Sequence, residues 1–323
     1  MTQPINKDAW LSALRTDYLE TFVPQGGAAI KFGVPVDGAD PSSVIQSVEA
    51  LGDDLGFFTA TVRSDETRLH MIDQVYFKIA SQVPWMQLTG IVLTKLATEL
   101  GYRSVAAGEA PFFERLAAAN GVEPRLVLME LRQKLNDRIF TQKRLAKDFR
   151  VAMTQLCLSQ ITGGPAGLKA ADALLDWLTG RNTLIAPVKP YYIFSRITRA
   201  NARHMLESLF HWAQFAGAQG SVVMFDLARL AVAKNPKDER VHYSKTALLD
   251  AYEVFRQFID SIDRMRGCLL VACPDPSFLD EANPRGIGAY TALKARIFDE
   301  VRDERLANPM AALVRIDSDG GAA

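Results

Sequence analysis

The amino-acid sequence predicts an α/β protein in which a parallel five-stranded sheet carries a large all-helical insertion. Short apolar runs rich in Val, Ile, Leu and Phe are widely spaced and mostly bounded by Gly, Pro or Asp, the pattern of strands buried on both faces of a parallel sheet. Longer segments with helical periodicity lie between them, as parallel connections require. The five predicted strands are residues 28–32, 57–62, 221–225, 268–272 and 312–316.

The helices are predicted from apolar residues that recur at spacings of three and four. Residues 200–216 and 247–265 each present such an apolar face. The interval between the second and third strands is far longer than the dozen or more residues of one crossover, and most of it has helical character. The helices expected there are residues 91–100, 111–119, 124–139, 141–161 and 168–178.

This pattern predicts a core interrupted by one inserted domain. We expect residues 1–85 to form the N-terminal half of the core, residues 86–190 the helical insertion, and residues 191–323 the C-terminal half.

Composition excludes several classes of protein. The chain has 323 residues, 48% of them hydrophobic, which is enough for a full core and excludes disorder as the main state. Its 37 Lys and Arg are balanced by 37 Asp and Glu, so no overall field demands a nucleic-acid partner. Cys157, Cys268 and Cys273 form no CxxC pair, which argues against a disulfide framework or a cysteine-based zinc site. Without an apolar run long enough for a signal peptide or a span, we expect a cytoplasmic protein with no membrane partner.

A degenerate phosphate-binding loop follows the first predicted strand. Gly33 and Gly38 keep the glycine spacing of the GxxxxGK[ST] motif, but Ala39 stands at the lysine position and Asp40 at the hydroxyl position. The lysine of the motif reaches the β- and γ-phosphates, and the hydroxyl holds Mg²⁺. Losing the lysine removes a charge-assisted contact, and an aspartate beside a triphosphate is repulsive.

The third predicted strand ends in the form of a Walker B motif. Asp226 closes an apolar run, at the position that holds Mg²⁺ through its water shell in ATPases. The next residue, where a glutamate would orient the attacking water, is Leu227. A strand that merely ends in a capping aspartate is the alternative. We therefore predict no catalytic residue, and no metal unless Asp226 holds Mg²⁺.

With both motifs in view, the chain resembles the BREX-type ATP-binding family of BrxC and BrxD, which are P-loop ATPases of bacteriophage-defence islands. The resemblance implies a P-loop NTPase fold of the ASCE/AAA-like type and a place in antiviral defence. It is carried, in the order of the family, by residues 26–32, 148–149, 177–180, 201–209, 252–260, 268–276, 285–286 and 290–293, and by Arg296.

The departures from the family pattern predict a pseudo-ATPase that keeps the fold and has lost hydrolysis. It would be a structural or regulatory subunit that needs no cofactor, with ATP and Mg²⁺ bound only if the degenerate loop retains affinity. The expected partners are other subunits of a defence complex (an active ATPase, a nuclease or a methyltransferase) or further copies of the chain. One alternative is an active or slow Mg-ATPase that uses Asp226 for Mg²⁺ and Lys31 for the phosphates.

A second alternative is a DNA-binding module built on two basic stretches. Residues 132–150 hold seven Lys or Arg against two Asp, and residues 177–206 hold five Lys or Arg, no acid and several aromatic residues. Such a surface would contact DNA phosphates or an acidic partner, whereas solvated helix faces are the plainer interpretation. The candidate contacts are Arg132, Lys134, Lys143, Arg144, Lys147, Arg196, Arg199 and Arg203.

Arg296 stands where the family keeps an arginine. In oligomeric ATPases such a residue can reach the γ-phosphate of a neighbouring subunit. The resemblance therefore implies a trans-acting arginine, and the alternative is a surface ion pair with Asp299 or Glu300 on the same helix.

Overall fold

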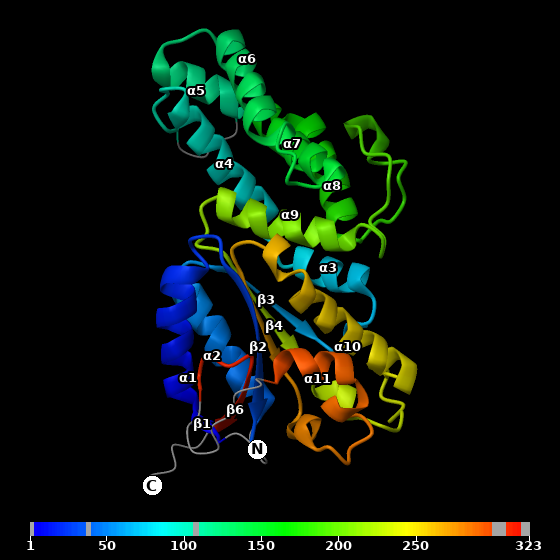
Figure 1. Cartoon of the computed structure of the whole chain (residues 1–323). Helices are drawn as coiled ribbons and strands as arrows, with labels where there is room; N and C mark the ends of the chain where they lie inside the picture. Colours follow the sequence, from blue (N-terminus) through cyan, green and yellow to red (C-terminus); the bar gives the residue numbers. More distant parts are fainter. Residues whose placement is uncertain (1–2, 37–39, 106–109, 299–307, 318–323) are drawn as a thin grey trace. The chain divides into compact units, whose positions relative to one another are not determined.

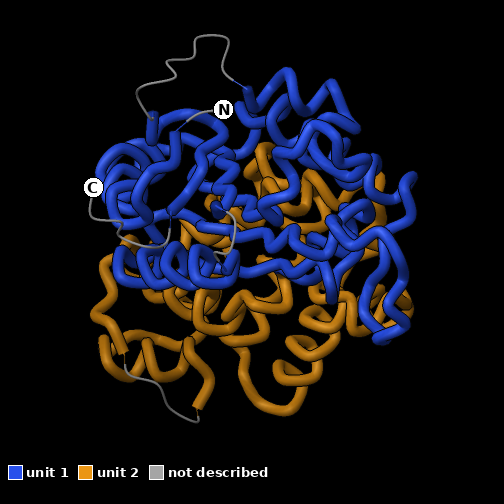
Figure 2. The backbone as a smooth tube through the Cα atoms, turned by 90° about the horizontal axis from the view of Figure 1, so that it is seen from below, with its two compact units in different colours: residues 1–79, 218–323 blue, residues 80–217 orange. Residues whose placement is uncertain are grey.

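The computed structural model describes residues 3–36, 40–105, 110–298 and 308–317. The chain divides into two compact units, one built from Met1–Ile79 with Ala218–Ala323 and the other from Ala80–Gly217 (Figure 2). The second unit extends to Gly217, so residues 191–217, which we expected in the C-terminal half of the core, lie in the helical unit.

The first unit is built on a six-stranded, wholly parallel sheet with the order β1-β6-β2-β5-β4-β3 (Figure 1). All five predicted strands are present, with ends shifted by a few residues. The sixth strand, β1, was not predicted, because two residues that pair with β6 at the sheet edge carry no periodic signal. The strands are β1 (Ile5–Asn6), β2 (Ala28–Pro35), β3 (Phe58–Arg63), β4 (Ser221–Asp226), β5 (Cys268–Cys273) and β6 (Leu313–Asp317).

Helices cover both faces of this sheet (Figure 1). On one face Trp10 of α1 and Val44 and Val48 of α2 join a buried cluster with Met224 and Val271 of the strands. On the other face the rings of Phe32 and Phe225 meet Phe255 of α10 edge-on. The helices of this unit are α1 (Lys7–Ala13), the π-helical η1 (Leu14–Phe22), α2 (Pro41–Asp54), α3 (Ile72–Ala80), α10 (Lys245–Asp260) and α11 (Thr291–Ile297), with short 3-10 turns η4 (Ala228–Ala231), η5 (Ile262–Arg264), η6 (Pro276–Leu279) and η7 (Ile287–Ala289).

The described residues of the second unit form helices joined by loops and include no strand. Three expected helices begin elsewhere: the one predicted from residue 91 starts at Trp85, the one from residue 141 at Lys147, and the one from residue 168 at Gly164. Gly167 allows α7 and α8 to pack closely, because a Cβ there would lie 2.4 Å from the carbonyl oxygen of Ser159. The helices are α4 (Trp85–Glu99), α5 (Phe112–Asn120), α6 (Pro124–Leu135), η2 (Asn136–Phe140), α7 (Lys147–Thr162), α8 (Gly164–Thr179), η3 (Lys189–Tyr191) and α9 (Ala202–Phe215).

Across the described residues, every helix is too short or too polar to cross a bilayer. Cys157, Cys268 and Cys273 are buried free thiols, and burial raises the pKa of each.

Candidate functional site

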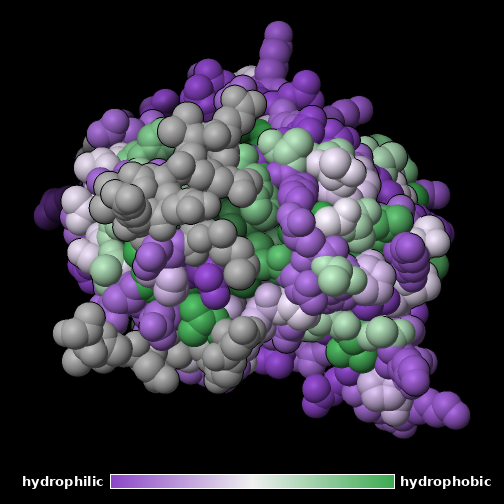
Figure 3. Space-filling model, turned by 60° about the horizontal axis from the view of Figure 1, so that its bottom comes forward, coloured by the Kyte–Doolittle hydropathy of each residue, from purple (hydrophilic) through white to green (hydrophobic). Residues whose placement is uncertain are grey.

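The candidate site lies where the parallel strands of the first unit end, since ligands of open parallel sheets bind outside the carboxyl ends of the strands. Figure 3 shows the molecule from this side, where hydrophobic residues are exposed among hydrophilic ones. Asp226 ends β4, and Arg63 ends the neighbouring β3 as its register partner. Arg63 Nη2 lies 3.8 Å from Asp226 Oδ2, and Arg63 Nε lies 3.3 Å from Asp65 Oδ1. Asp226, the predicted Walker B aspartate, thus has a guanidinium group of the same chain beside it.

Asp226 is held by the protein itself. It is only 7% exposed, and its Oδ1 accepts a hydrogen bond of 3.0 Å from the backbone N–H of Ala228. Burial raises the pKa of the Asp226 carboxyl, the Ala228 hydrogen bond and the Arg63 charge oppose this rise, and the negative charges of Asp65 and Asp40 add to it. The carboxylate is therefore less readily ionised than an exposed one.

Gly33 was assigned to the phosphate loop, but it lies inside β2, where it pairs with Val314 of β6. A Cβ at this position would lie 2.8 Å from Ile316 Cδ1 and 3.1 Å from Trp10 Cη2. The glycine spacing in the sequence therefore reflects close packing of α1 against the sheet at this position. Gly38 and Ala39, the next predicted loop residues, lie outside the described residues.

Asp40 is the N-cap of α2. Its Oδ1 accepts a hydrogen bond of 2.9 Å from the backbone N–H of Ser42, and Pro41 between them has no N–H to donate. Lys7, at the start of α1, donates from Nζ to Ser43 Oγ at 3.1 Å. The N-terminus of a helix after a strand is where phosphate groups bind in P-loops, because its N–H groups and dipole attract anions. In this protein the carboxylate of Asp40 takes that position at the N-terminus of α2.

Lys31, proposed as a substitute phosphate ligand, is only 3% exposed and points elsewhere. Its Nζ donates to the backbone carbonyls of Met310 and Ala311, the latter at 3.1 Å, and lies 4.5 Å from the ring centroid of Tyr18. It also stands four residues before the end of β2, roughly 13 Å along the strand. Lys31 therefore holds the segment that precedes β6 and is not part of the strand-end site.

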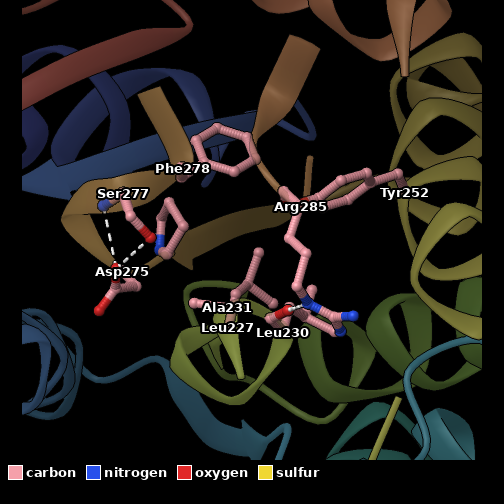
Figure 4. Close-up of a pocket in the computed structure, with 9 residues that line it drawn as sticks. Leu227, Leu230, Ala231, Tyr252, Asp275, Ser277, Phe278 and Arg285 are labelled. Carbon is pink, nitrogen blue, oxygen red and sulfur yellow. Dashed lines mark hydrogen bonds between the residues drawn. The ribbon is translucent and has the colours of Figure 1, made fainter. Parts of the chain in front are cut away.

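A small, mainly apolar pocket opens beyond the ends of β4 and β5 (Figure 4). Leu227, at the position of the catalytic glutamate, is 1% exposed and forms part of its wall. The carboxylate of Asp275 accepts hydrogen bonds from the backbone N–H and the hydroxyl of Ser277, at 2.9 and 2.5 Å. The remaining lining residues are Leu230, Ala231, Tyr252, Pro274, Phe278 and Arg285.

Arg285 fixes the loops around this pocket. Its Nε donates to the carbonyl of Leu230 at 2.7 Å and its Nη2 to the carbonyl of Tyr243 at 3.0 Å, while its own carbonyl accepts from the Tyr252 hydroxyl at 2.7 Å. Burial lowers the pKa of the guanidinium group. The side chain joins three segments that are far apart in the sequence, which defines a structural role.

Arg296 is in an ion pair with another helix. Its Nε and Nη2 both donate to the carboxylate of Asp260 on α10, the latter at 3.2 Å, and its Nη1 donates to the carbonyl of Ala292 at 2.9 Å. Arg256 also donates to Asp260 and pairs with Glu253, and its hydrogen bonds lower the pKa of Glu253 to about 2. Asp299 and Glu300, the predicted partners of Arg296, lie outside the described residues.

The predicted basic residues of the helical unit fall into two groups. Lys134 lies 3.2 Å from Glu99, which also accepts from Arg138 at 2.8 Å. By contrast, Lys143 and Arg144 are exposed and form no ion pair within the described part of the chain. The remaining candidates, of which all but the half-buried Arg203 are exposed, are Arg132, Lys147, Arg196, Arg199 and Arg203.

Two hydrogen bonds join the two basic stretches, and a third joins the first stretch to Ser208 in α9. The ring Nε2 of His204 lies 3.3 Å from the carbonyl oxygen of Arg144. The Ser195 hydroxyl donates to the Asp148 carboxylate, and the backbone N–H of Ala146 donates to the Ser208 hydroxyl at 2.8 Å. The segment that leads into α9 therefore lies against the segment that leads into α7.

Sequence reasoning missed several residues at the strand ends, among them Arg63, Asp65, Lys7 and Arg285. Arg63 follows an apolar run as Asp226 does, and two parallel strands that end in opposite charges are a signal that could have found this pair. Lys7 acts from a segment distant in the sequence, and no local pattern points to it. Arg285 belongs to segment 285–286, which carries the family resemblance, but no role at this site was predicted for it.

With this geometry in place, comparison with known families assigns the class of protein. The family described as BREX system ATP-binding protein BrxC/D matches residues 12–318. The chain therefore belongs to this family, whose members are ATP-binding components of the BREX phage-defence system, and the resemblance seen in the sequence is confirmed. No curated protein and no solved structure matches the chain.

Proposed function

We propose that this protein is a non-hydrolysing member of its family, a subunit that keeps a P-loop NTPase fold of the ASCE/AAA-like type for assembly or regulation. The observation that carries the proposal is that side chains of the protein itself occupy the positions where a phosphate and a metal ion would bind in an ATPase. The Asp40 carboxylate caps α2 where a phosphate would bind, and the Arg63 guanidinium lies beside Asp226 where a metal ion would act.

The strand order supports the fold assignment. The strand that leads to the loop, β2, is separated from the strand that ends in Asp226, β4, by one further parallel strand, β5. An added strand between these two is the arrangement that distinguishes ASCE-type P-loop proteins.

The bounds of β2 and α2 support a different alignment of the motif from the one that glycine spacing gave. In GxxxxGK[ST] the first glycine follows the strand, and the lysine and hydroxyl open the helix. Because α2 begins at Pro41, placing the lysine and hydroxyl at the start of this helix puts the motif on residues 35–42, and its first glycine position then falls on Pro35, the last residue of β2. Asp40 then stands at the second glycine, Pro41 at the lysine and Ser42 at the hydroxyl. The lysine is absent under either alignment.

The residues at the strand ends do not fit a magnesium–phosphate group. Mg²⁺ requires oxygen ligands in near-octahedral geometry, whereas the Asp226 carboxylate has a guanidinium nitrogen 3.8 Å away and burial raises its pKa. Leu227 cannot orient a water molecule. We therefore assign no catalytic role to any of these residues.

We further propose that the protein acts through other subunits of a defence complex or through copies of itself. Candidate partners are an active ATPase, a nuclease or a methyltransferase. Arg296 would reach a neighbour's phosphate only after leaving Asp260, so we assign it to the contact between α10 and α11.

The first test is calorimetric titration of the purified protein with Mg·ATP, followed by a turnover assay on the same sample. We expect neither heat of binding nor phosphate release. Turnover that is lost in Asp226→Asn would overturn the proposal, and binding without turnover would make the protein a nucleotide sensor.

A restoration experiment tests the alignment itself. Asp40→Gly combined with Pro41→Lys removes the carboxylate and supplies the lysine at the helix start, so we expect it to gain affinity for ATP. The matched control, Ala39→Lys combined with Asp40→Ser, restores the motif in the alignment given by the glycines alone and should gain none. The reverse result would contradict the alignment on residues 35–42.

A further inference from the structure

A surface of the helical unit combines exposed cations with exposed aromatic rings. Lys143, Arg144 and Lys147 lie before and at the start of α7, and the segment that follows η3 supplies Tyr192, Phe194 and Arg196 (Figure 1). We refer to these six residues as the basic-aromatic face.

The fold brings the two halves of this face together. Ser195 donates its hydroxyl to Asp148, and His204 Nε2 lies 3.3 Å from the carbonyl oxygen of Arg144, so the segment after η3 and the start of α9 lie against the segment that begins α7. The indole N–H of Trp177 donates to the carbonyl of Ser195 at 3.1 Å and fixes the same segment against α8. The face is therefore a product of tertiary contacts within this unit.

The side chains of the face are available to a ligand. Tyr192 is 68% and Phe194 64% exposed, although Ile193 between them is fully buried and anchors the segment. Lys143, Arg144, Lys147 and Arg196 are exposed and have no ion-pair partner in the described ranges. Lys134, a few residues earlier, shows the opposite case because Glu99 neutralises it.

Tyr192 is held in an unusual backbone conformation. Its φ of 65° lies in the left-handed region, which a bulky side chain rarely adopts. A buried tyrosine would gain packing energy in return, but this ring faces solvent. Tyr192 is the C-cap of η3, and its backbone N–H donates to the carbonyl of Lys189 at 3.0 Å, so this conformation ends the helix and leaves the ring open to solvent.

We propose that the basic-aromatic face binds single-stranded nucleic acid, with phosphates on the cations and unpaired bases stacked on the rings of Tyr192 and Phe194. Aromatic rings flanked by cations match the alternation of base and phosphate in a single strand. In a duplex the bases stack on one another and are not open to side-chain rings. This proposal is independent of whether the sheet unit hydrolyses ATP.

The test is fluorescence anisotropy of the full-length protein with a labelled oligothymidylate over a series of NaCl concentrations. A duplex of the same length and poly-glutamate serve as competing ligands. We expect the single strand to bind more tightly than the duplex and poly-glutamate not to displace it.

Two variants separate the roles of rings and charges. Tyr192→Ala with Phe194→Ala should weaken binding at least about tenfold without changing the salt dependence, and Tyr192→Phe should retain affinity. Changing Lys143, Arg144, Lys147 and Arg196 to Gln should weaken binding and lower the slope of log affinity against log salt by roughly 0.7 for each phosphate that the protein no longer neutralises.

The matched control uses exposed residues of α6 that lie outside the face. Arg125→Gln with Met129→Ala removes one cation and one exposed apolar side chain and should leave affinity unchanged. Equal binding of duplex and single strand, or binding that the ring variant leaves intact, would overturn the proposal. Displacement by poly-glutamate would instead identify an acidic protein partner, and no binding would also refute it.

Discussion

The charged residues at the strand ends of the sheet unit have partners within the chain, whereas the cations of the basic-aromatic face have no counter-charge among the described residues. At the strand ends Asp226 has Arg63 and the α2 N-terminus has Asp40, and between α11 and α10 Arg296 has Asp260. On the face, Lys143 and Arg144 have no counter-charge in the described part of the chain.

In our proposals, the first region has lost its nucleotide ligand and the second binds a ligand through its unpaired cations. Charges are retained at little cost in stability when water or an internal partner satisfies them, and an internal partner competes with any ligand. The helical unit contains its own internal comparison, because Glu99 pairs with Lys134 and Arg138, while Lys143 and Arg144 of the same stretch form no ion pair among the described residues. Substitutions that remove one member of a pair measure what that pair contributes to the free energy of unfolding.

The largest effect is expected at Arg285, a buried charge of the sheet unit whose guanidinium group donates to two loop carbonyls. Arg285→Ala leaves the carbonyls of Leu230 and Tyr243 without their donor, so we expect a loss of about 3 kcal/mol in the free energy of unfolding. Urea denaturation measures it. Arg285→Lys should recover only part of the loss, because one ammonium group replaces two differently directed N–H donors. A loss below about 1 kcal/mol would mean that these carbonyls find other donors.

Gly33→Ala tests whether this glycine serves packing or a phosphate. The added methyl group meets Ile316 and Trp10, so we expect a loss of about 2 kcal/mol of stability and no change in the response to Mg·ATP. Gly90→Ala in α4 is the control: its nearest neighbour is a flexible glutamine end at 3.4 Å, and alanine favours helix. A Gly33→Ala protein of unchanged stability would contradict the packing role.

Asp226→Asn should have a smaller effect, one that depends on pH. Because burial raises the folded-state pKa of this carboxyl, ionisation costs the folded protein more than the unfolded chain. The variant should therefore gain stability relative to the wild type as pH rises from the ordinary aspartate pKa of about 3.9 through the raised value, and the gain should stay constant above it. Denaturation at a series of pH values measures this difference. A difference that declines with rising pH would show that Arg63 outweighs burial.

The smallest effect is expected for Glu99→Gln. Glu99 pairs with Lys134 and Arg138 near the surface, where water screens the charges, so we expect a loss of about 0.5 kcal/mol. The hydrogen bond from Arg138 lowers the pKa of Glu99, so this contribution is present above the unfolded value of about 4.3 and disappears as pH falls through the folded one. Gln133→Ala, on an exposed position of α6, serves as the control. A stability difference between Glu99→Gln and the wild type that persists at acid pH would exclude the ion pair as its cause.

Much of the fold could be predicted because buried strands and amphipathic helices leave periodic patterns. The five apolar runs became β2 to β6, whereas β1 is too short to leave a pattern. The start of α7 was misplaced by six residues, since residues 141–146 continue the helical composition but form a turn that Ser208 stabilises from α9.

The sequence by itself determined the α/β class, the helical insertion, the family and the loss of the lysine and glutamate, because these depend on residue types and spacings along the chain. Only the tertiary structure decided that Gly33 packs against Trp10, that Lys31 holds the segment before β6, and that Arg63 reaches Asp226. It also decided which of the described cations have a counter-charge. Whether a charge is paired depends on which distant segments the fold places beside it, and local sequence does not contain that information.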